Sequence, residues 1–273
     1  MPELPEMESY RRLLGRLLDS RAITDVQVNR EKSINVAPEA FRRQLVGATV
    51  RTIDRRGKML LFRIDEERIL LLHLMLGGLM VWGTEAERPQ RTVQVEIAFG
   101  AERLYWVGLR LGYLHLLGAG QVEEALRKLG PEPLSADFTE TALRCLLQGR
   151  RVALKALLVD QAVVAGIGNC YSDEICFAAG LQPSRSCDSL QSAEVARLYR
   201  AIGAVLNEAT AAGGYMDVPL FAGDTTTGGF DARCRVYDRA GEPCVRCGAA
   251  IVRRDVGSRK SFCCTACQSG DGI

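Results

Sequence analysis

CVRC at residues 244–247 and CTAC at residues 264–267 are the stretches of sequence that most constrain the fold. Sixteen residues separate these two Cys-x-x-Cys pairs. Two such pairs at this spacing are typical of a Cys₄ zinc site, in which each pair forms a tight turn that directs two thiolates to one ion. The pattern therefore predicts one zinc ion per chain, with four ligands: Cys244, Cys247, Cys264 and Cys267.

Cys263 stands beside Cys264 and is an alternative ligand. It would lengthen the second pair to a Cys-x-x-x-Cys spacing, so Cys264 is favoured. Four thiolates leave no coordination position for a water molecule, which indicates a structural rather than a catalytic zinc. We expect the ion to hold a hairpin whose tip, at residues 257–260, presents basic groups. A zinc hairpin alone does not define a function.

The chain around this hairpin is basic. Between Asp231 and Lys260 there are eight Arg or Lys residues and four Asp or Glu residues, whereas the net charge of the 273 residues is only +2. This local surplus favours a polyanionic partner, although a solvated basic surface would have the same composition.

The rest of the composition is that of a soluble globular protein, with 47% hydrophobic and 25% charged residues. No apolar run approaches the roughly 20 residues needed to cross a bilayer. The acidic start MPELPEMESY lacks the features of a signal peptide, so we expect a cytoplasmic location. Because the cytoplasm is reducing, we do not expect the ten cysteines to form disulfides. The two histidines, His73 and His115, are too few to suggest His-rich metal hydrolase sites or Ser-His-Asp catalysis.

Hydrophobic periodicity divides the remaining chain into two lobes. A helix is predicted to begin at Pro5, because an apolar stripe follows from Met7 to Leu18 at spacings of three and four. Short, often alternating segments then predict strands as far as residue 117. These segments lie at residues 23–29, 48–55, 59–64, 69–76, 93–99 and 103–109.

After residue 130 the pattern becomes helical, at residues 138–147, 152–160, 171–179 and 189–211. Residues 216–229 are predicted to form a mobile loop. The fold class is therefore α+β, with an N-terminal antiparallel β-sandwich behind a leading helix, and a helical lobe that ends in the Cys₄ hairpin. We place the domains at residues 1–120, 136–230 and 231–273, with a linker at residues 121–135.

The N-terminus carries a candidate nucleophile. Proline after the initiator methionine usually permits removal of Met1, which would expose Pro2 as a secondary amine. An α-amino group titrates at about 7.7–8.0, so part of it is neutral near pH 7. Condensation with an aldehyde would give an iminium that promotes β-elimination. Glu3 and Glu6 could share the proton transfers, and both lie where a helix N-terminus favours negative charge. Taken alone, the same residues are also an ordinary polar helix start.

Five stretches occur here in the order that is typical of one family. They are MPELPEMESYRRLL at residue 1, RRGKMLLF at residue 55, LGPEPLS at residue 129, VAGIGNCYSDEICF at residue 164, and the Cys₄ hairpin. The chain resembles the formamidopyrimidine-DNA glycosylase and endonuclease VIII family of base-excision repair enzymes over nearly its whole length.

The resemblance implies a monomeric enzyme that binds damaged double-stranded DNA through a helix-two-turn-helix domain and associates with the nucleoid. It implies that Pro2 attacks C1′ of the damaged nucleotide, that Glu3 acts as acid and base on the sugar, and that Glu6 positions the first helix. The strand would then be cut by β- and δ-elimination. Lys58 would lie near the target nucleotide, and Asn169 and Arg259 would hold phosphates around the extruded base.

The sequence departs from the family pattern where the gap left by the extruded base is filled. Family members that act on 8-oxoguanine usually carry Met, Arg and Phe there. Here Leu76 stands at the methionine position and Arg110 is retained, but no phenylalanine follows two residues later. Tyr113 is a candidate substitute.

Three hypotheses follow. The first is a bifunctional DNA glycosylase and abasic-site lyase. The second is an enzyme of the same design for a lesion other than 8-oxoguanine, or a lyase with little base release. The third is a non-catalytic zinc-hairpin protein that binds damaged DNA. A protein that only binds DNA has no need for Pro2, Glu3 and Lys58 together.

Overall fold

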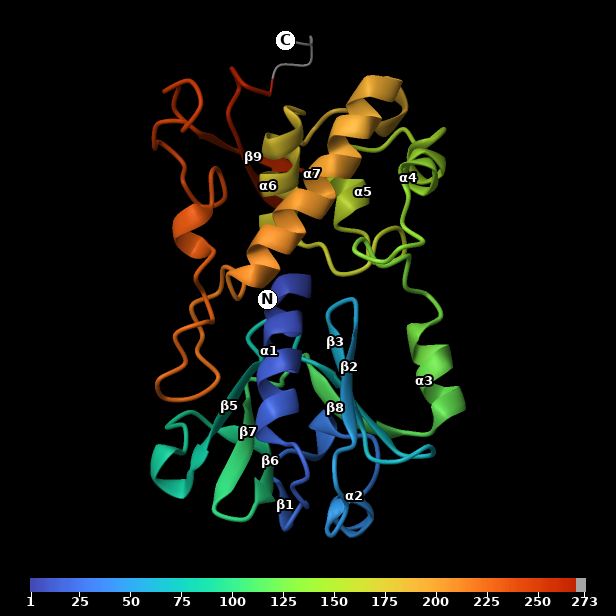
Figure 1. Cartoon of the computed structure of the whole chain (residues 1–273), viewed down its shortest axis with the longest axis vertical. Coiled ribbons are helices and arrows are strands. Elements are labelled where there is room, and N and C mark those ends of the chain that lie inside the picture. Colours follow the sequence, from blue (N-terminus) through green and yellow to red (C-terminus); the bar gives the residue numbers. More distant parts are fainter. Residues whose placement is uncertain (269–273) are drawn as a thin grey trace. The chain divides into compact units, whose positions relative to one another are not determined.

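The structure, a computed structural model, describes residues 1–268. The chain forms two compact units (Figure 1). The first contains residues Met1–Arg127 and Ala212–Gly229. The second contains Lys128–Ala211 and, of the described residues, Phe230–Gln268.

Two four-stranded antiparallel sheets form the first unit, as the alternating segments predict. One sheet has the strand order β1-β6-β7-β5 and the other β2-β3-β4-β8. The strands are β1 (Asp25–Val28), β2 (Thr52–Arg56), β3 (Met59–Arg63), β4 (Ile69–His73), β5 (Leu79–Thr84), β6 (Val93–Phe99), β7 (Glu102–Val107) and β8 (Tyr113–Leu117).

Alternation along the strands sorts the side chains of this unit into a core and an outer layer. On β3, Leu60 and Phe62 enter the main core, and the ring of Phe62 meets Trp106 of the opposite sheet edge to face. Leu61 points the other way and packs with Val122 of helix α3 (Ala119–Leu126). The two sheets therefore enclose one hydrophobic core, which makes the unit a β-sandwich.

The leading helix, α1 (Leu4–Leu17), begins one residue earlier than predicted and has Pro5 in its first turn. Its buried stripe, including Met7, Tyr10 and Leu14, belongs to the sandwich core. Helices α2 (Pro38–Leu45) and α3 and strands β5 and β8 are not among the elements predicted from the sequence. Three-residue 3₁₀ turns occur at Glu31–Ser33, Glu85–Glu87, Cys187–Ser189 and Asp231–Arg233.

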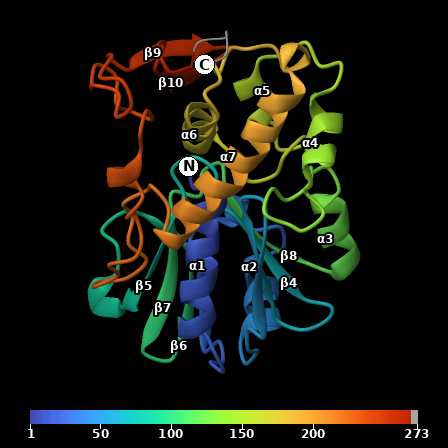
Figure 2. The ribbon, with the colours of Figure 1, turned by 45° about the horizontal axis from the view of Figure 1, so that its top comes forward.

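The second unit is helical and ends in a hairpin (Figure 2). Its helices are α4 (Glu140–Leu147), α5 (Leu154–Leu158), α6 (Asn169–Ala179) and α7 (Ser192–Ala211). The α6 helix is buried along most of its length, and Gly180 ends it in the left-handed conformation. The hairpin strands β9 (Val252–Val256) and β10 (Arg259–Cys263) pair antiparallel.

This division differs from the predicted domain order at residues 212–229, which pack with the sandwich although they follow the last long helix. Leu220 is fully buried in the sandwich core, and its carbonyl accepts the backbone N–H of Trp82 at 2.6 Å. Asp224 holds the segment by accepting backbone N–H groups of Leu220, Thr226 and Thr227. The segment predicted as a mobile loop is thus fastened to the sandwich at several points. Among residues 1–268, none of the helices combines the length and the hydrophobicity that a bilayer crossing needs.

Candidate functional site

The start of α1 buries the candidate nucleophile and both carboxylates. Pro2 is buried, Glu3 is 2% exposed and Glu6 is fully buried. Glu3 is the N-cap residue, and its backbone N–H donates to Glu6 Oε2 at 2.7 Å, while its own carboxylate accepts the backbone N–H of Glu6. This reciprocal capping box fixes Glu3 and Glu6 relative to each other, directly after Pro2.

Glu6 also joins the helix to the 212–229 segment. Its other oxygen, Oε1, accepts the backbone N–H of Tyr215 at 2.7 Å. The preceding residue, Gly214, has a φ of +82°, and a Cβ built on it would stand 2.2 Å from Glu6 Oε1. The backbone can approach the carboxylate this closely only because residue 214 is a glycine. Glu6 therefore joins the start of α1 to the 212–229 segment.

Lys58 lies at the β2–β3 turn, on the same unit as the N-terminus. The turn needs the left-handed φ of Gly57 (+55°), and the lysine is only 6% exposed. Arg55 fastens the turn to α1, because its side chain donates to Glu8 at 3.3 Å and to the Gly57 carbonyl at 3.0 Å. Burial, together with the positive charge of Lys58, lowers the pKa of His73 to about 4. His73 is therefore neutral near pH 7, so the positive charge beside the β2–β3 turn comes from Lys58 and not from His73.

Two loops carry the residues predicted to fill a gap in DNA. Leu76 lies between β4 and β5 and is 67% exposed, and Arg110 is exposed between β7 and β8. The candidate substitute, Tyr113, does not join them, because it lies in β8 and stacks on His115 with ring centroids 4.2 Å apart. Leu111 is the exposed side chain instead, at 62%.

In the second unit, Asn169 is the first residue of α6. Its backbone carbonyl accepts a hydrogen bond from the Lys155 ammonium at 3.1 Å, which fixes the start of α6 on Lys155. The side-chain Oδ1 is buried and has no hydrogen-bond partner among the described residues. A buried polar atom left in this way indicates a site that a ligand or water completes.

Adjacent carboxylates on α6 hold the chain that carries Arg259. Asp173 accepts the Lys155 ammonium at 2.7 Å, the Ser261 hydroxyl at 2.7 Å and the Phe262 backbone N–H at 3.0 Å. Burial raises the pKa of Asp173 to about 6, against the opposing effect of Lys155. Asn169 and strand β10, which begins at Arg259, are therefore linked through Lys155 and Asp173.

The next residue, Glu174, makes a second connection to the same part of the chain. Its buried carboxylate accepts backbone N–H groups of Arg235, Val236 and Tyr237 at 2.8–3.0 Å. Burial raises the pKa of Glu174, and these three donors oppose that effect. The segment that leads into the hairpin is thus anchored on α6.

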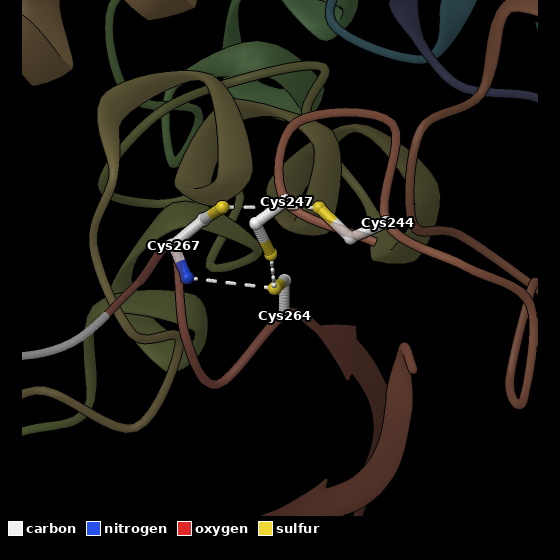
Figure 3. A group of neighbouring side chains, drawn as sticks. All are labelled: Cys244, Cys247, Cys264 and Cys267. Carbon is white, nitrogen blue, oxygen red and sulfur yellow. Dashed lines mark hydrogen bonds between the residues drawn. The ribbon is translucent and has the colours of Figure 1, made fainter. Parts of the chain in front are cut away.

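The four predicted metal ligands converge, as Figure 3 shows. All four Sγ atoms lie within 4.8 Å of one another, with Cys247 and Cys264 at 3.5 Å and Cys244 and Cys267 at 3.8 Å. Four sulfurs about 2.3 Å from a zinc ion at the centre of a tetrahedron would be roughly 3.8 Å apart. The alternative ligand Cys263 faces Gln182 instead, at 3.6 Å.

Two family models match most of this chain. The formamidopyrimidine-DNA glycosylase N-terminal domain matches residues 1–113, and the H2TH domain of the same enzymes matches residues 129–217. The chain belongs to the formamidopyrimidine-DNA glycosylase family. Membership makes it an enzyme of the DNA glycosylase class.

Two relatives and two solved structures illustrate the match to this glycosylase family. Formamidopyrimidine-DNA glycosylase of Symbiobacterium thermophilum is 41% identical over 98% of this chain and 89% of that protein. The enzyme of Desulfitobacterium hafniense is 35% identical over 98% and 100%. The Lactococcus lactis glycosylase bound to DNA with an abasic site is 30% identical, covers 98% and 99%, and has a TM-score of 0.91. MutM bound to DNA containing carbocyclic 8-oxo-G is 29% identical, covers 98% and 100%, and has a TM-score of 0.90.

Sequence reasoning missed two features of this member of the glycosylase family. Leu111 was overlooked, although the flanking Gly108 and Gly112 indicate a loop in which a leucine would be exposed. Lys155 was also overlooked, although a lone lysine in the apolar run VALKALLV (residues 152–159) indicates a buried ion pair.

Proposed function

We propose that the chain releases damaged bases from double-stranded DNA and then cuts the strand at the resulting abasic site, with the amine of Pro2 as the nucleophile. Removal of Met1 is required, because an amide nitrogen cannot form an iminium. The observation that carries the proposal is the buried Pro2-Glu3 start, which Glu6 fastens to both α1 and the 212–229 segment.

The reaction follows from these groups. The Pro2 nitrogen forms a bond to C1′ while the glycosidic bond breaks and the base leaves with that electron pair, taking up a proton. Glu3 then donates a proton to O4′ as the sugar ring opens, which leaves an iminium between Pro2 and C1′. Loss of a C2′ proton expels the 3′ phosphate, and a second elimination expels the 5′ phosphate. Water finally hydrolyses the iminium and restores the amine.

Lys58 is a buried cation of the sandwich unit, which also contains Pro2. We assign its ammonium to the target nucleotide and its phosphate. In the second unit, Asn169 and Arg259 are assigned to phosphates around the extruded base. Their link through Lys155 and Asp173 supports this pairing, because one network fixes both. Leu76 and Arg110 are assigned to the space that the extruded nucleotide leaves, and the exposed Leu111 joins them.

Zinc is the metal we assign to Cys244, Cys247, Cys264 and Cys267. Softness of the thiolates and the sulfur spacing both fit a tetrahedral zinc ion. Its contribution would be structural, since it would hold the two Cys-x-x-Cys turns that frame the β9–β10 hairpin.

Trapping with borohydride tests the proposal. Reduction during turnover of abasic-site DNA is expected to link the wild-type chain covalently to the DNA, and Pro2→Gly is expected to give much less product at equal protein concentration. Equal trapping by Pro2→Gly would overturn the assignment of the nucleophile.

The lesion class needs a separate measurement. Duplexes that each contain one modified base are scored for base release and for strand cutting. Release of oxidised purines would place this chain with family members that act on 8-oxoguanine. Release of other lesions only would favour the second hypothesis, for which the leucines at 76 and 111 are the supporting observation.

A further inference from the structure

The turn between α5 and α6 leads the chain into Asn169, and three of its backbone groups bind one side chain. Gln161 donates its side-chain N–H groups to the carbonyl of Val159 at 3.0 Å and to that of Ile167 at 2.7 Å. Its Oε1 accepts the backbone N–H of Gly166 at 2.9 Å. One amide therefore ties the end of α5 to the residues directly before α6.

These three contacts suit a glutamine and no similar side chain. Two carbonyls require two N–H donors and one backbone N–H requires an acceptor, so the partners fix the orientation of the Gln161 amide. A glutamate would place a carboxylate oxygen against two carbonyl oxygens. A methionine would fill the same space but leave all three backbone groups without this partner.

A second stretch of chain holds the backbone of Gln161. Its carbonyl accepts the backbone N–H of Gly130 at 2.8 Å, and the Pro131 carbonyl accepts the N–H of Ala165 at 3.0 Å. A Cβ built on Gly130 would stand 2.5 Å from the carbonyl oxygen of Val163, so this close packing requires a glycine. The LGPEPLS motif of the sequence thus supports the turn from one side, and the Gln161 side chain closes it.

Asn169 follows this turn and is held on both sides. Gln161 binds the carbonyl of Ile167, two residues earlier, and Lys155 binds the carbonyl of Asn169 itself. Because a peptide group is rigid and planar, each held carbonyl also fixes the atoms bonded to it. The two contacts together therefore set the direction of the Asn169 side chain, whose buried Oδ1 has no hydrogen-bond partner among residues 1–268.

We propose that Gln161 is a positioning residue, which directs the side chain of Asn169 toward the phosphate that Asn169 binds. The inference rests on the proposed function, in which Asn169 holds a phosphate beside the extruded base. Both N–H groups of the Gln161 amide are used within the turn, so we assign Gln161 no contact of its own with DNA. Its whole effect on DNA binding then passes through Asn169.

A double-mutant cycle of DNA affinity tests this dependence. The proteins are wild type, Gln161→Met, Asn169→Ala and the double variant, and the probe is a duplex with a tetrahydrofuran abasic site, which cannot form an iminium. Each single variant is expected to bind about ten-fold more weakly than wild type. The double variant should also bind about ten-fold more weakly, and not about a hundred-fold, because Gln161 has nothing to direct once the Asn169 side chain is gone.

The salt dependence of binding separates positioning from a general loss of structure. Asn169 is neutral, so loss of its phosphate contact releases no additional counterions, and Gln161→Met should keep the wild-type slope of log K against log salt. If Gln161→Met instead displaced the basic hairpin or unfolded the unit, contacts from charged side chains would be lost and the slope would become shallower.

Two controls accompany the cycle. Gln148→Met changes an exposed glutamine that follows α4, and it should bind as wild type does. Val195→Ala removes a buried side chain of α7, so it should lower the free energy of unfolding but leave the affinity unchanged. Denaturation curves of all variants show whether each is folded where binding is measured.

The inference is overturned if Gln161→Met binds as wild type does, if the two single effects add in the double variant, or if the salt slope of Gln161→Met becomes shallower. Each of these results leaves the phosphate contact of Asn169 in place. Wild-type affinity in Asn169→Ala would instead show that the role proposed for Asn169 is wrong, and the inference about Gln161 would fall with it.

Discussion

Glu6 shows how much one residue of this site depends on distant sequence. Its place in the first turn of a helix is evident from MPELPE, and so is a favourable interaction of its charge with the helix N-terminus. Its second partner is the Tyr215 backbone, 209 residues away. No local pattern predicts that contact, because it depends on how the 212–229 segment returns to the sandwich.

Two glycines allow the contact of Glu6 to be tested at this scale. Gly214→Ala would force a Cβ against Glu6 Oε1, whereas Gly223, with a similar φ of +89°, has open space at its Cβ position. Gly223→Ala should lower the free energy of unfolding by about 1 kcal/mol through backbone strain, and Gly214→Ala should lower it further because its Cβ also displaces Glu6. Only Gly214→Ala should also reduce trapping on abasic DNA. Equal trapping by the two variants, measured beside their denaturation curves, would show that the Glu6 contact does not position the nucleophile.

The buried pair of Lys155 and Asp173 predicts a pH-dependent loss of stability. Because the pKa of Asp173 is raised above its unfolded value, its contribution to stability falls as the pH rises from about 4 to about 6. Lys155→Met removes the ammonium that opposes this rise, so the pKa of Asp173 should be higher still in the variant. The free energy of unfolding of the variant should therefore go on decreasing above pH 6. We expect the difference in unfolding free energy between Lys155→Met and wild type to be small at pH 5 and about 3–5 kcal/mol at pH 8.

Urea denaturation at the two pH values measures this difference. The double variant Lys155→Met/Asp173→Asn is the control, since it also removes the unpaired carboxylate and should recover most of the loss at pH 8. An equal loss at both pH values would contradict an ionised Asp173 as its cause.

Among the elements of the fold, the zinc hairpin is the one whose metal ligands the sequence predicts in full. Its four ligands follow from spacing alone, and the structure brings them together with Cys264 rather than Cys263. What spacing does not reveal is the anchorage of the hairpin on α6. Asp173 and Glu174 are buried acids inside a helix, and their partners lie some 60 to 90 residues later.

Loss of one ligand should therefore affect metal and DNA binding together. Cys247→Ser is expected to lower the zinc-to-protein ratio and to weaken DNA binding, because the β9–β10 hairpin loses the ion that holds it. Cys145→Ser, an exposed cysteine outside the cluster, should change neither. Elemental analysis and DNA titration give the two results. An unchanged zinc-to-protein ratio in Cys247→Ser would show that Cys247 is not a zinc ligand.

At the scale of the whole molecule, the sequence predicted the two kinds of unit but not where the chain crosses between them. The sandwich follows from strands that alternate, and the helical unit from apolar positions at helical spacing. Strand β5 and helix α3 were missed because glycines at 78 and 83 flank the short apolar run of β5, and because α3 has a single buried residue, Val122. The return of residues 212–229 was missed because it rests on Leu220 and Glu6, which are far apart in sequence.

Binding of the whole protein to DNA should depend steeply on salt, although its net charge is only +2. Phosphate contacts release counterions, so each lost contact lowers the slope of log K against log salt by about one. Arg259→Ala is expected to show this change, and Arg43→Ala to keep the wild-type slope. A titration series over salt concentration in which both variants match wild type would exclude Arg259 from phosphate binding.

The position of the covalent link to DNA shows directly whether the amine of Pro2 is the nucleophile. After borohydride reduction with abasic-site DNA, the complex is digested and the modified peptide is identified by mass spectrometry. We expect a sugar remnant on the nitrogen of Pro2, in a peptide that begins at residue 2. A remnant on Lys58 or another lysine, or active enzyme that retains Met1, would contradict it.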